Sequence, residues 1–226
     1  MSSRWRFRVK GFPTAYGARR LLVHAAAFFA LAGAVPAVAA EKLVLAFGDS
    51  LTAGYGLKPG QGFADQLQAA LRRDGIAARV HNAGVSGDTT AGGKARLGWV
   101  LTGLKLKPDL AIVELGANDM LRGLPPEQAR ANLEAILAEL QRRKIPVLLA
   151  GMLASPNLGA DYRRRFDSIY PALARRYNVR LYPFFLNGVT GQPGMHIGDR
   201  MHPNMRGVAV IVKGILPQVK AGLGAK

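Results

Sequence analysis

Residues 110–119 read Leu-Ala-Ile-Val-Glu-Leu-Gly-Ala-Asn-Asp, an almost wholly apolar run that ends in a glycine and a polar pair. Residues 146–150, Pro-Val-Leu-Leu-Ala, form a second run of the same kind. A strand with one face in water alternates apolar and polar side chains, whereas a parallel strand covered by helices on both faces is apolar throughout. These two stretches therefore predict the buried centre of a parallel sheet.

The same alternation of elements continues on both sides of these two runs. Three more short apolar runs predict strands at 43–47, 78–82 and 179–182. Between and after the runs, apolar residues recur with helical periodicity at 63–73, 96–104, 126–143, 162–177 and 204–219. Strands that alternate with helices are joined by right-handed crossovers that place helices on both faces of the sheet. The sequence thus predicts an α/β protein, a three-layer α/β/α sandwich, with one domain over residues 41–226.

Polar, glycine-rich segments follow the first three predicted strands, at 48–54, 83–89 and 116–119. In an open parallel sheet, ligands bind beyond the carboxyl ends of the strands. Because these ends meet at one edge of the sheet, the three loops are expected to share one rim. We therefore expect the functional site there.

Several residues on this rim have the chemistry that acyl transfer needs: a nucleophile, a base, a group that orients the base, and donors for an oxyanion. Ser50 ends the first strand, where a tight turn would expose its hydroxyl. Asp199 precedes His202 by three residues, so that it can accept from one ring nitrogen while the other nitrogen faces outward as a base. Asn118 can offer a side-chain amide and Gly87 a backbone N–H.

Each of these residues also has an ordinary structural interpretation. Ser50 could cap a helix, His202 could be a surface or satisfied core histidine, and Asn118 and Gly87 could simply form turns. Taken singly, these interpretations compete well with catalysis. The presence of all four on one rim favours the catalytic interpretation.

Four blocks carry a family resemblance: Gly48-Asp-Ser-Leu, Ser-Gly87-Asp-Thr, Gly116-Ala-Asn-Asp and Asp199-x-x-His. In order and spacing, over residues 42–220, they resemble the four sequence blocks of the GDSL esterases, also called SGNH hydrolases. The longer strings around them are similar to the bacterial periplasmic branch described as arylesterase, acyl-CoA thioesterase and lysophospholipase.

The resemblance implies a role for each of the residues already singled out. Ser50 would be the nucleophile, His202 the base and Asp199 its orienting partner. The oxyanion hole would consist of the Ser50 and Gly87 N–H groups and the Asn118 side chain. The resemblance also implies a five-stranded, flavodoxin-like parallel sheet and no cofactor.

Apolar residues near the rim predict a groove for one acyl chain, because methionine and leucine on loops can adapt to a flexible ligand. Local packing beneath the loops accounts for some of them. The candidates are Met120, Leu121, Met152, Leu153, Pro156, Leu158 and Ile197. The expected substrates are aryl esters, acyl thioesters and lysophospholipids. The alternatives are a carbohydrate O-acetyl esterase with the same catalytic residues and a non-catalytic flavodoxin-like binding module, which the presence of Ser50, Asn118 and His202 disfavours.

Composition and missing motifs exclude other classes of site. The chain has no cysteine, which excludes disulfides, thiolate zinc sites and a cysteine nucleophile. It has no His-Glu-x-x-His motif, so no metal site is expected, and no Gly-x-Ser-x-Gly elbow of an α/β-hydrolase. A phosphate-binding loop ending at Lys94 would need glycine at Asp88 and a hydroxyl residue at Ala95.

Residues 1–40 have the three-part layout of a secretory signal peptide. A basic stretch ends at Arg19-Arg20, an apolar run covers 21–35, and small residues at 37–40 offer cleavage after Ala39 or Ala40. An uncleaved membrane anchor is the alternative, since residues 21–40 nearly reach the ~20 apolar residues that span a bilayer. The paired arginines faintly resemble a twin-arginine signal, but general export is favoured. The protein is expected to be periplasmic or secreted.

The chain is strongly basic, with 31 Lys and Arg against 14 Asp and Glu and a net charge of +17. Residues 1–40 hold six of the basic residues and none of the acidic ones, so a chain that begins at Glu41 carries +11. This charge favours a weak contact with an anionic membrane surface. A nucleic-acid partner fits poorly with export, and the sequence does not predict an oligomeric state.

Overall fold

The structure is a computed structural model that describes Met1 and residues 40–225. Apart from its two ends, the predicted signal peptide lies outside the described residues. Within them, no helix is both long enough and apolar enough to cross a membrane.

Five parallel strands form one sheet in the order β2-β1-β3-β4-β5, which is the order of flavodoxin-like folds. The predicted sheet and its five strands are thereby confirmed. The strands are β1 (Lys42–Gly48), β2 (Ala78–Gly84), β3 (Leu110–Glu114), β4 (Val147–Ala150) and β5 (Arg180–Tyr182).

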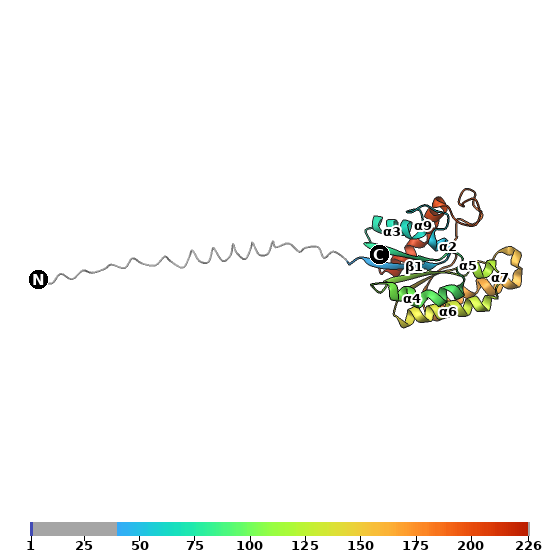
Figure 1. Cartoon of the computed structure of the whole chain (residues 1–226), viewed down its shortest axis with the longest axis horizontal. Helices are drawn as coiled ribbons and strands as arrows, with labels where there is room; N and C mark the ends of the chain where they lie inside the picture. Colours follow the sequence, from blue (N-terminus) through green and yellow to red (C-terminus); the bar gives the residue numbers. More distant parts are fainter. Residues whose placement is uncertain (2–39, 226) are drawn as a thin grey trace. The chain divides into compact units, whose positions relative to one another are not determined.

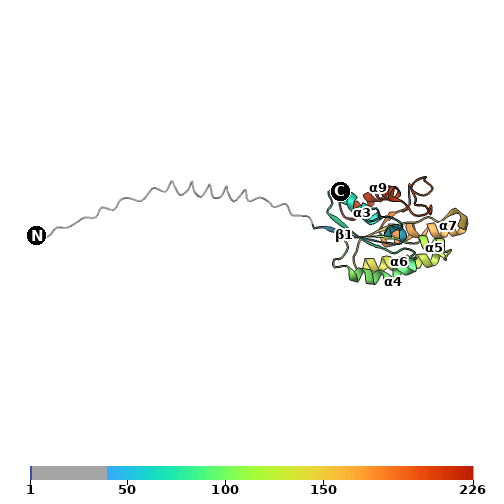
Figure 2. The same cartoon turned by 45° about the horizontal axis from the view of Figure 1, so that its top comes forward.

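Helices cover both faces of the sheet, as the three-layer prediction requires. Figures 1 and 2 show α3 and α9 on one face and α4 and α6 on the opposite face. The described helices are α2 (Ser50–Ala53), α3 (Phe63–Arg73), α4 (Thr90–Gly103), α5 (Ala117–Leu121), α6 (Pro126–Arg142), the 3₁₀ turn η1 (Pro156–Leu158), α7 (Ala160–Asp167), α8 (Ile169–Tyr177) and α9 (Met205–Gly222).

The burial of the strands follows their place in the sheet. All residues of the central strands β3 and β4 are buried, as their apolar sequences predict. The edge strand β2 instead alternates buried residues with exposed ones such as Arg79 and His81. The uninterrupted apolar run therefore marks a central strand.

Helix α6 shows how the sequence sets an element's bounds. Pro126 occupies the first turn, where its missing N–H costs nothing, and Arg142 in the last turn suits the negative end of the helix dipole. Leu133, Leu137 and Leu140 recur at spacings of three and four, and all three are buried against the sheet. The observed helix ends one residue before the predicted boundary.

Helix α9 extends to Gly222, three residues beyond its predicted end. Two other predicted helices differ more from the observed ones. Helix α4 begins at Thr90 and not at residue 96, because the Thr89 hydroxyl accepts from the Gly92 N–H and caps the helix, although glycines at 92 and 93 weaken the helical pattern. The single helix predicted for 162–177 is divided at Ser168 into α7 and α8.

Candidate active site

Ser50, His202 and Asp199 form one chain of hydrogen-bonding groups at the carboxyl end of the sheet. The His202 Nε2 atom lies 2.9 Å from the Ser50 Oγ atom, and His202 Nδ1 lies 2.6 Å from Asp199 Oδ2. The structure thus brings together two segments that are 152 residues apart in sequence. This arrangement can move a proton from the serine hydroxyl to the imidazole, with the carboxylate holding the ring's tautomer.

Ser50 is the first residue of the short helix α2, which differs from the expected tight turn. Asp49, and not the serine, caps this helix, because its Oδ1 atom accepts from the Leu51 N–H at 3.0 Å. The N–H of Ser50 belongs to the first turn and has no intrahelical acceptor. The helix therefore presents the hydroxyl and the N–H of the same residue at one end.

The loop from Asp199 to Pro203 holds the imidazole in place. Asp199 Oδ1 accepts from the backbone N–H groups of Met201, at 2.9 Å, and His202, at 3.0 Å. Arg200 adopts the left-handed region, with φ of +60°, which is strained for a residue that is not glycine. The hydrogen bond from the His202 N–H is the largest cause that lowers the pKa of Asp199, to about 2, so this carboxylate remains ionised at neutral pH.

Tyr55 adds a contact that the sequence analysis did not predict. Its ring centroid lies 4.6 Å from that of His202 at an interplanar angle of 41°, and the tyrosine is about half exposed. One side of the imidazole is therefore shielded by an aromatic ring.

The loop that contains Gly87 is fixed by two arginines. Gly87 has φ of +85°, a conformation that favours glycine, and its carbonyl accepts from Arg122 Nη2 at 2.7 Å. Arg96 pairs with Asp88 at 2.6 Å and donates to the carbonyl of Gly48 at 2.9 Å. Arg96 thereby ties this loop to the end of β1, beside Ser50.

Asn118, on α5, is held by two acceptors. Its Nδ2 atom donates to the Asp88 carbonyl at 2.9 Å and to Asp49 Oδ2 at 3.1 Å. Because the amide nitrogen carries two hydrogens, an oxyanion must share one of them or replace an acceptor.

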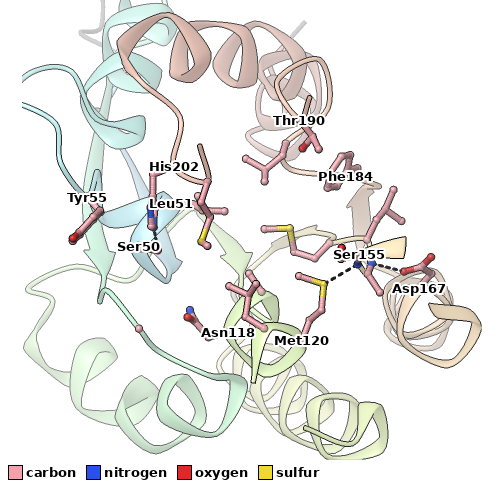
Figure 3. Close-up of a pocket in the computed structure, with 18 of the residues that line it drawn as sticks. Ser50, Leu51, Tyr55, Asn118, Met120, Ser155, Asp167, Phe184, Thr190 and His202 are labelled. Carbon is pink, nitrogen blue, oxygen red and sulfur yellow. Dashed lines mark hydrogen bonds between the residues drawn. The ribbon is translucent and has the colours of Figure 1, made fainter. Parts of the chain in front are cut away.

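A cavity of about 580 Å³ joins these groups to the apolar residues of the rim. Figure 3 shows Ser50, His202 and Asn118 at one end, Met120 further along, and Phe184 and Asp167 at the other end. The predicted groove residues that line it are Met120, Leu121, Met152, Leu153 and Pro156. Its size fits a small-molecule site.

Leu158 and Ile197 lie elsewhere, contrary to their assignment to the groove. Leu158 sits at the end of η1 and packs, partly buried, against the hydrophobic core, whereas Pro156 at the start of the same turn faces the cavity. Ile197 lines a separate small hollow, and its Cδ1 atom lies 2.7 Å from where a Cβ on Gly56 would be. A residue that is close in sequence to the rim can still direct its side chain elsewhere, because the local course of the loop decides the direction.

Sequence reasoning also missed the far end of the cavity. Phe184, Leu186 and Thr190 come from the segment after β5, and Asp167 from the end of α7. The Asp167 Oδ1 atom accepts from the Ala154 N–H at 2.7 Å and so anchors the loop after β4 that forms one wall. No motif marks these residues, and only the folded chain brings them together.

The described residues contain no cluster of three or more histidine or acidic side chains that could hold a metal ion.

Comparisons with known proteins show the family of this chain. Residues 46–210 match the model of the GDSL-like Lipase/Acylhydrolase family. The chain is 40% identical over 182 residues to "Esterase TesA" of Pseudomonas aeruginosa, which covers 80% of this chain and 90% of that protein. It is 38% identical over 168 residues to "Thioesterase 1/protease 1/lysophospholipase L1" of Escherichia coli K12, and the match covers 74% of this chain and 77% of that protein.

A solved structure supports the same assignment. The SGNH-hydrolase family esterase AlinE4 is 55% identical to this chain with a TM-score of 0.70, over 81% of this chain and 97% of that one. The family resemblance read from the four sequence blocks is thus confirmed. By the match to the family model and the identity to these relatives, the chain belongs to the GDSL-like lipase/acylhydrolase family and is a carboxylic ester hydrolase.

Proposed function

We propose that the protein hydrolyses esters and thioesters of single acyl chains by a Ser-His-Asp mechanism with an acyl-enzyme intermediate. The observation that carries this proposal is the hydrogen-bonded chain from Ser50 through His202 to Asp199 at one end of an apolar cavity. The test is loss of hydrolysis on replacement of Ser50.

In the first half of the reaction, Ser50 Oγ attacks the carbonyl carbon while His202 Nε2 takes its proton. The imidazolium then gives this proton to the leaving alcohol or thiol, and the bond to the leaving group breaks. In the second half, water attacks the acyl-serine with His202 again as base, which releases the acid and restores the Ser50 hydroxyl. Asp199, ionised at neutral pH, stabilises the imidazolium in both halves.

Asn118 and Gly87 are the proposed donors to the tetrahedral oxyanion, together with the Ser50 N–H. We expect Asn118→Ala to lower kcat by about 10²- to 10³-fold with little change in KM, because the donor matters mainly once charge develops on oxygen. Steady-state kinetics with a p-nitrophenyl ester measures both constants. A rise in KM alone would make Asn118 a group that binds the ground state.

The acyl chain is proposed to lie along the cavity, against Met120, Met152 and Leu153. The size of the cavity and the apolar side chains that line it suit a single acyl chain. The printed names of the relatives, an esterase and a thioesterase/lysophospholipase, support this substrate class. The proposed substrates are therefore aryl esters, acyl thioesters and lysophospholipids, and two-chain phospholipids should be poor substrates.

A chain-length series tests the groove. We expect kcat/KM for p-nitrophenyl esters to rise from acetyl to medium chains and then level off, because each buried methylene contributes roughly 0.8 kcal/mol, or about fourfold at most. Leu153→Ala should flatten this rise. Leu106→Ala, at an exposed residue outside the cavity, is the matched control and should leave the slope as it is.

The opposite profile would contradict the groove. A rate that is highest for acetyl esters and collapses beyond about four carbons would favour the alternative, a carbohydrate O-acetyl esterase, whose pocket holds only a short acyl group.

Export is part of the proposal. Residues 1–40 would be removed as a signal peptide, which leaves a domain over 41–226 in the periplasm or outside the cell. N-terminal sequencing of the protein recovered from that compartment should begin at Ala40 or Glu41. A chain that retains its basic N-terminal stretch in the membrane fraction would favour the uncleaved anchor.

We also propose a weak contact between the cavity mouth and anionic membrane surfaces. Tyr55, Leu121, Leu153 and Met201 line the cavity and are each about half exposed, and the chain from Glu41 carries +11. Co-sedimentation of the exported chain with phosphatidylglycerol vesicles should exceed that with phosphatidylcholine vesicles and fall with added salt. Equal binding to both kinds of vesicle would contradict it.

A further inference from the structure

Two fully buried carboxyl groups beside Ser50 have no role in the mechanism above. Asp49 directly precedes the serine, and Glu114 ends β3, where it is the strand-register partner of Gly48. Glu114 Oε2 accepts from the Thr52 hydroxyl at 2.8 Å and is 3.4 Å from the Asp49 N–H. Glu114 thus contacts both the cap and the interior of helix α2, which carries Ser50.

The space for the Glu114 carboxyl is provided by Gly48. A Cβ at this position would lie 2.7 Å from Glu114 Oε2 and 2.1 Å from Thr52 Oγ1. Any other residue at 48 would therefore displace the glutamate or the threonine. The Glu114 side chain is therefore packed tightly into the junction between β1, β3 and α2.

Asp49 connects this junction to the oxyanion donors. Its Oδ1 atom accepts from the Leu51 N–H at 3.0 Å, in the first turn of α2, and its Oδ2 atom accepts from Asn118 Nδ2 at 3.1 Å. One carboxylate therefore fixes both the turn that carries the Ser50 N–H and the amide of Asn118. A movement of Asp49 would move the donors relative to Ser50.

The remaining oxygen of Glu114 indicates its protonation state. Among the described residues, Glu114 Oε1 is the one buried side-chain nitrogen or oxygen without a hydrogen-bond partner. An ionised carboxylate would leave this oxygen without a partner, which is costly in a buried site. A proton on it makes Glu114 a donor, and the Asp49 carboxylate is the neighbouring group that can accept.

Two neighbouring carboxyl groups that are both fully buried do not both stay ionised, because burial disfavours each charge and the two charges repel. Burial is the main cause that raises the pKa of both, and the negative charge of Asp49 raises that of Glu114 further, well above its usual range. Burial raises the pKa of Asp49 to about 6, although the hydrogen bonds from the Leu51 N–H and from the Glu114 side chain act to lower it. At neutral pH, Glu114 therefore keeps the proton and Asp49 carries the charge.

We propose that Glu114 is a positioning residue that acts as a neutral carboxylic acid, donating a hydrogen bond to Asp49 so that Asp49 holds Asn118 and the first turn of α2 in place for the oxyanion. This inference rests on the proposed function, because it assigns the pair to the oxyanion hole of that mechanism. Glu114 touches no substrate atom and would act only through Asp49.

Two substitutions of similar volume test whether the hydrogen bond that Glu114 donates is what matters: one keeps a donor and the other has none. Glu114→Gln keeps an N–H donor for Asp49 and an oxygen for the Thr52 hydroxyl, and should keep kcat within about threefold of wild type. Glu114→Leu removes both and should lower kcat by about 10- to 100-fold with KM within about twofold, since the loss falls on the transition state. Active-site titration with an organophosphonate normalises kcat to competent sites, so that partial unfolding does not count as lost catalysis.

Two spectroscopic measurements do not depend on turnover. The infrared difference spectrum between wild type and Glu114→Gln at neutral pH should show the carbonyl stretch of a protonated carboxylic acid in wild type only. Asp119→Asn is the matched control: this buried carboxylate accepts from the Thr90 N–H and hydroxyl, and its removal should leave that band in place. The side-chain amide resonances of Asn118 should shift in Glu114→Leu and stay near their wild-type positions in Glu114→Gln.

Several results would overturn the proposal. These are a loss of kcat in Glu114→Gln as large as in Glu114→Leu, full kcat in Glu114→Leu, or an acid band that is absent from wild type or persists in Glu114→Gln. If Glu114→Leu fails to fold, Glu114→Gln and the infrared band decide the question. If wild type hydrolyses no ester, the proposed function fails, while the band and the Asn118 resonances still test the carboxyl pair.

Discussion

Replacement of Ser50 by alanine is expected to lower kcat for ester hydrolysis by at least about 10⁴-fold while the fold is retained. The hydroxyl forms the covalent bond in the proposed mechanism, so that no other group can take its place. Ser50 is only partly buried at the start of a short helix capped by Asp49, and removal of its hydroxyl should therefore change thermal stability little. Steady-state kinetics and a thermal melt measure the two effects.

Ser168→Ala is the matched control for this substitution. Ser168 is exposed between α7 and α8, does not line the cavity, and donates its hydroxyl to the Arg165 carbonyl at 2.9 Å. Its removal should leave ester hydrolysis within experimental error of wild type. A Ser50→Ala variant with activity close to that of the control would exclude Ser50 as the nucleophile.

Replacement of Asp199 by asparagine is expected to lower kcat by about 10³- to 10⁴-fold. The carboxylate accepts from His202 Nδ1 at 2.6 Å and carries a full charge at neutral pH, because the His202 and Met201 N–H groups hold its pKa at about 2. An amide removes the charge that stabilises the imidazolium and can present an N–H to the ring, which selects the wrong tautomer.

The pH dependence gives a second readout for Asp199. Since the pKa of Asp199 lies far below neutral pH, this carboxylate should add no step of its own to the wild-type profile of kcat/KM between about pH 5 and 9. Asp74→Asn removes an ion pair with Lys220, and neither residue lines the cavity, so this control should keep the rate and the pH profile of wild type. An unaltered rate in Asp199→Asn would remove Asp199 from the mechanism.

The sequence predicts the sheet well because burial of a parallel strand on both faces requires an unbroken run of apolar residues, which is visible in the sequence. Central strands must be apolar on both faces, and β3 and β4 appear in the sequence as unbroken apolar runs. Helix α3 coincides with its predicted range, since its apolar residues keep helical spacing. The start of α4 was missed because Gly92 and Gly93 weaken the pattern, while the capping contact of Thr89 depends on backbone geometry.

For the site, too, the sequence predicts what the sheet topology determines and misses what depends on the local course of a loop. The catalytic candidates follow strands whose ends must meet, so topology alone places Ser50, Gly87 and Asn118 on one rim. The direction of a loop side chain has no such rule, and Leu158 and Ile197 turn away from the cavity. A charged residue within an apolar run is a signal of a buried polar role, and Glu114 is such a residue, although its partner Asp49 is 65 positions away in sequence.

Covalent labelling of the exported chain tests the central claim most directly. Incubation of residues 41–226 with an organophosphonate ester, followed by intact mass and peptide mapping, should give one adduct per chain on Ser50, together with loss of ester hydrolysis in proportion to labelling. The Ser50→Ala variant should take up no label. An adduct on another residue that accompanies the loss of activity, or full activity in a chain labelled at Ser50, would contradict the proposed mechanism.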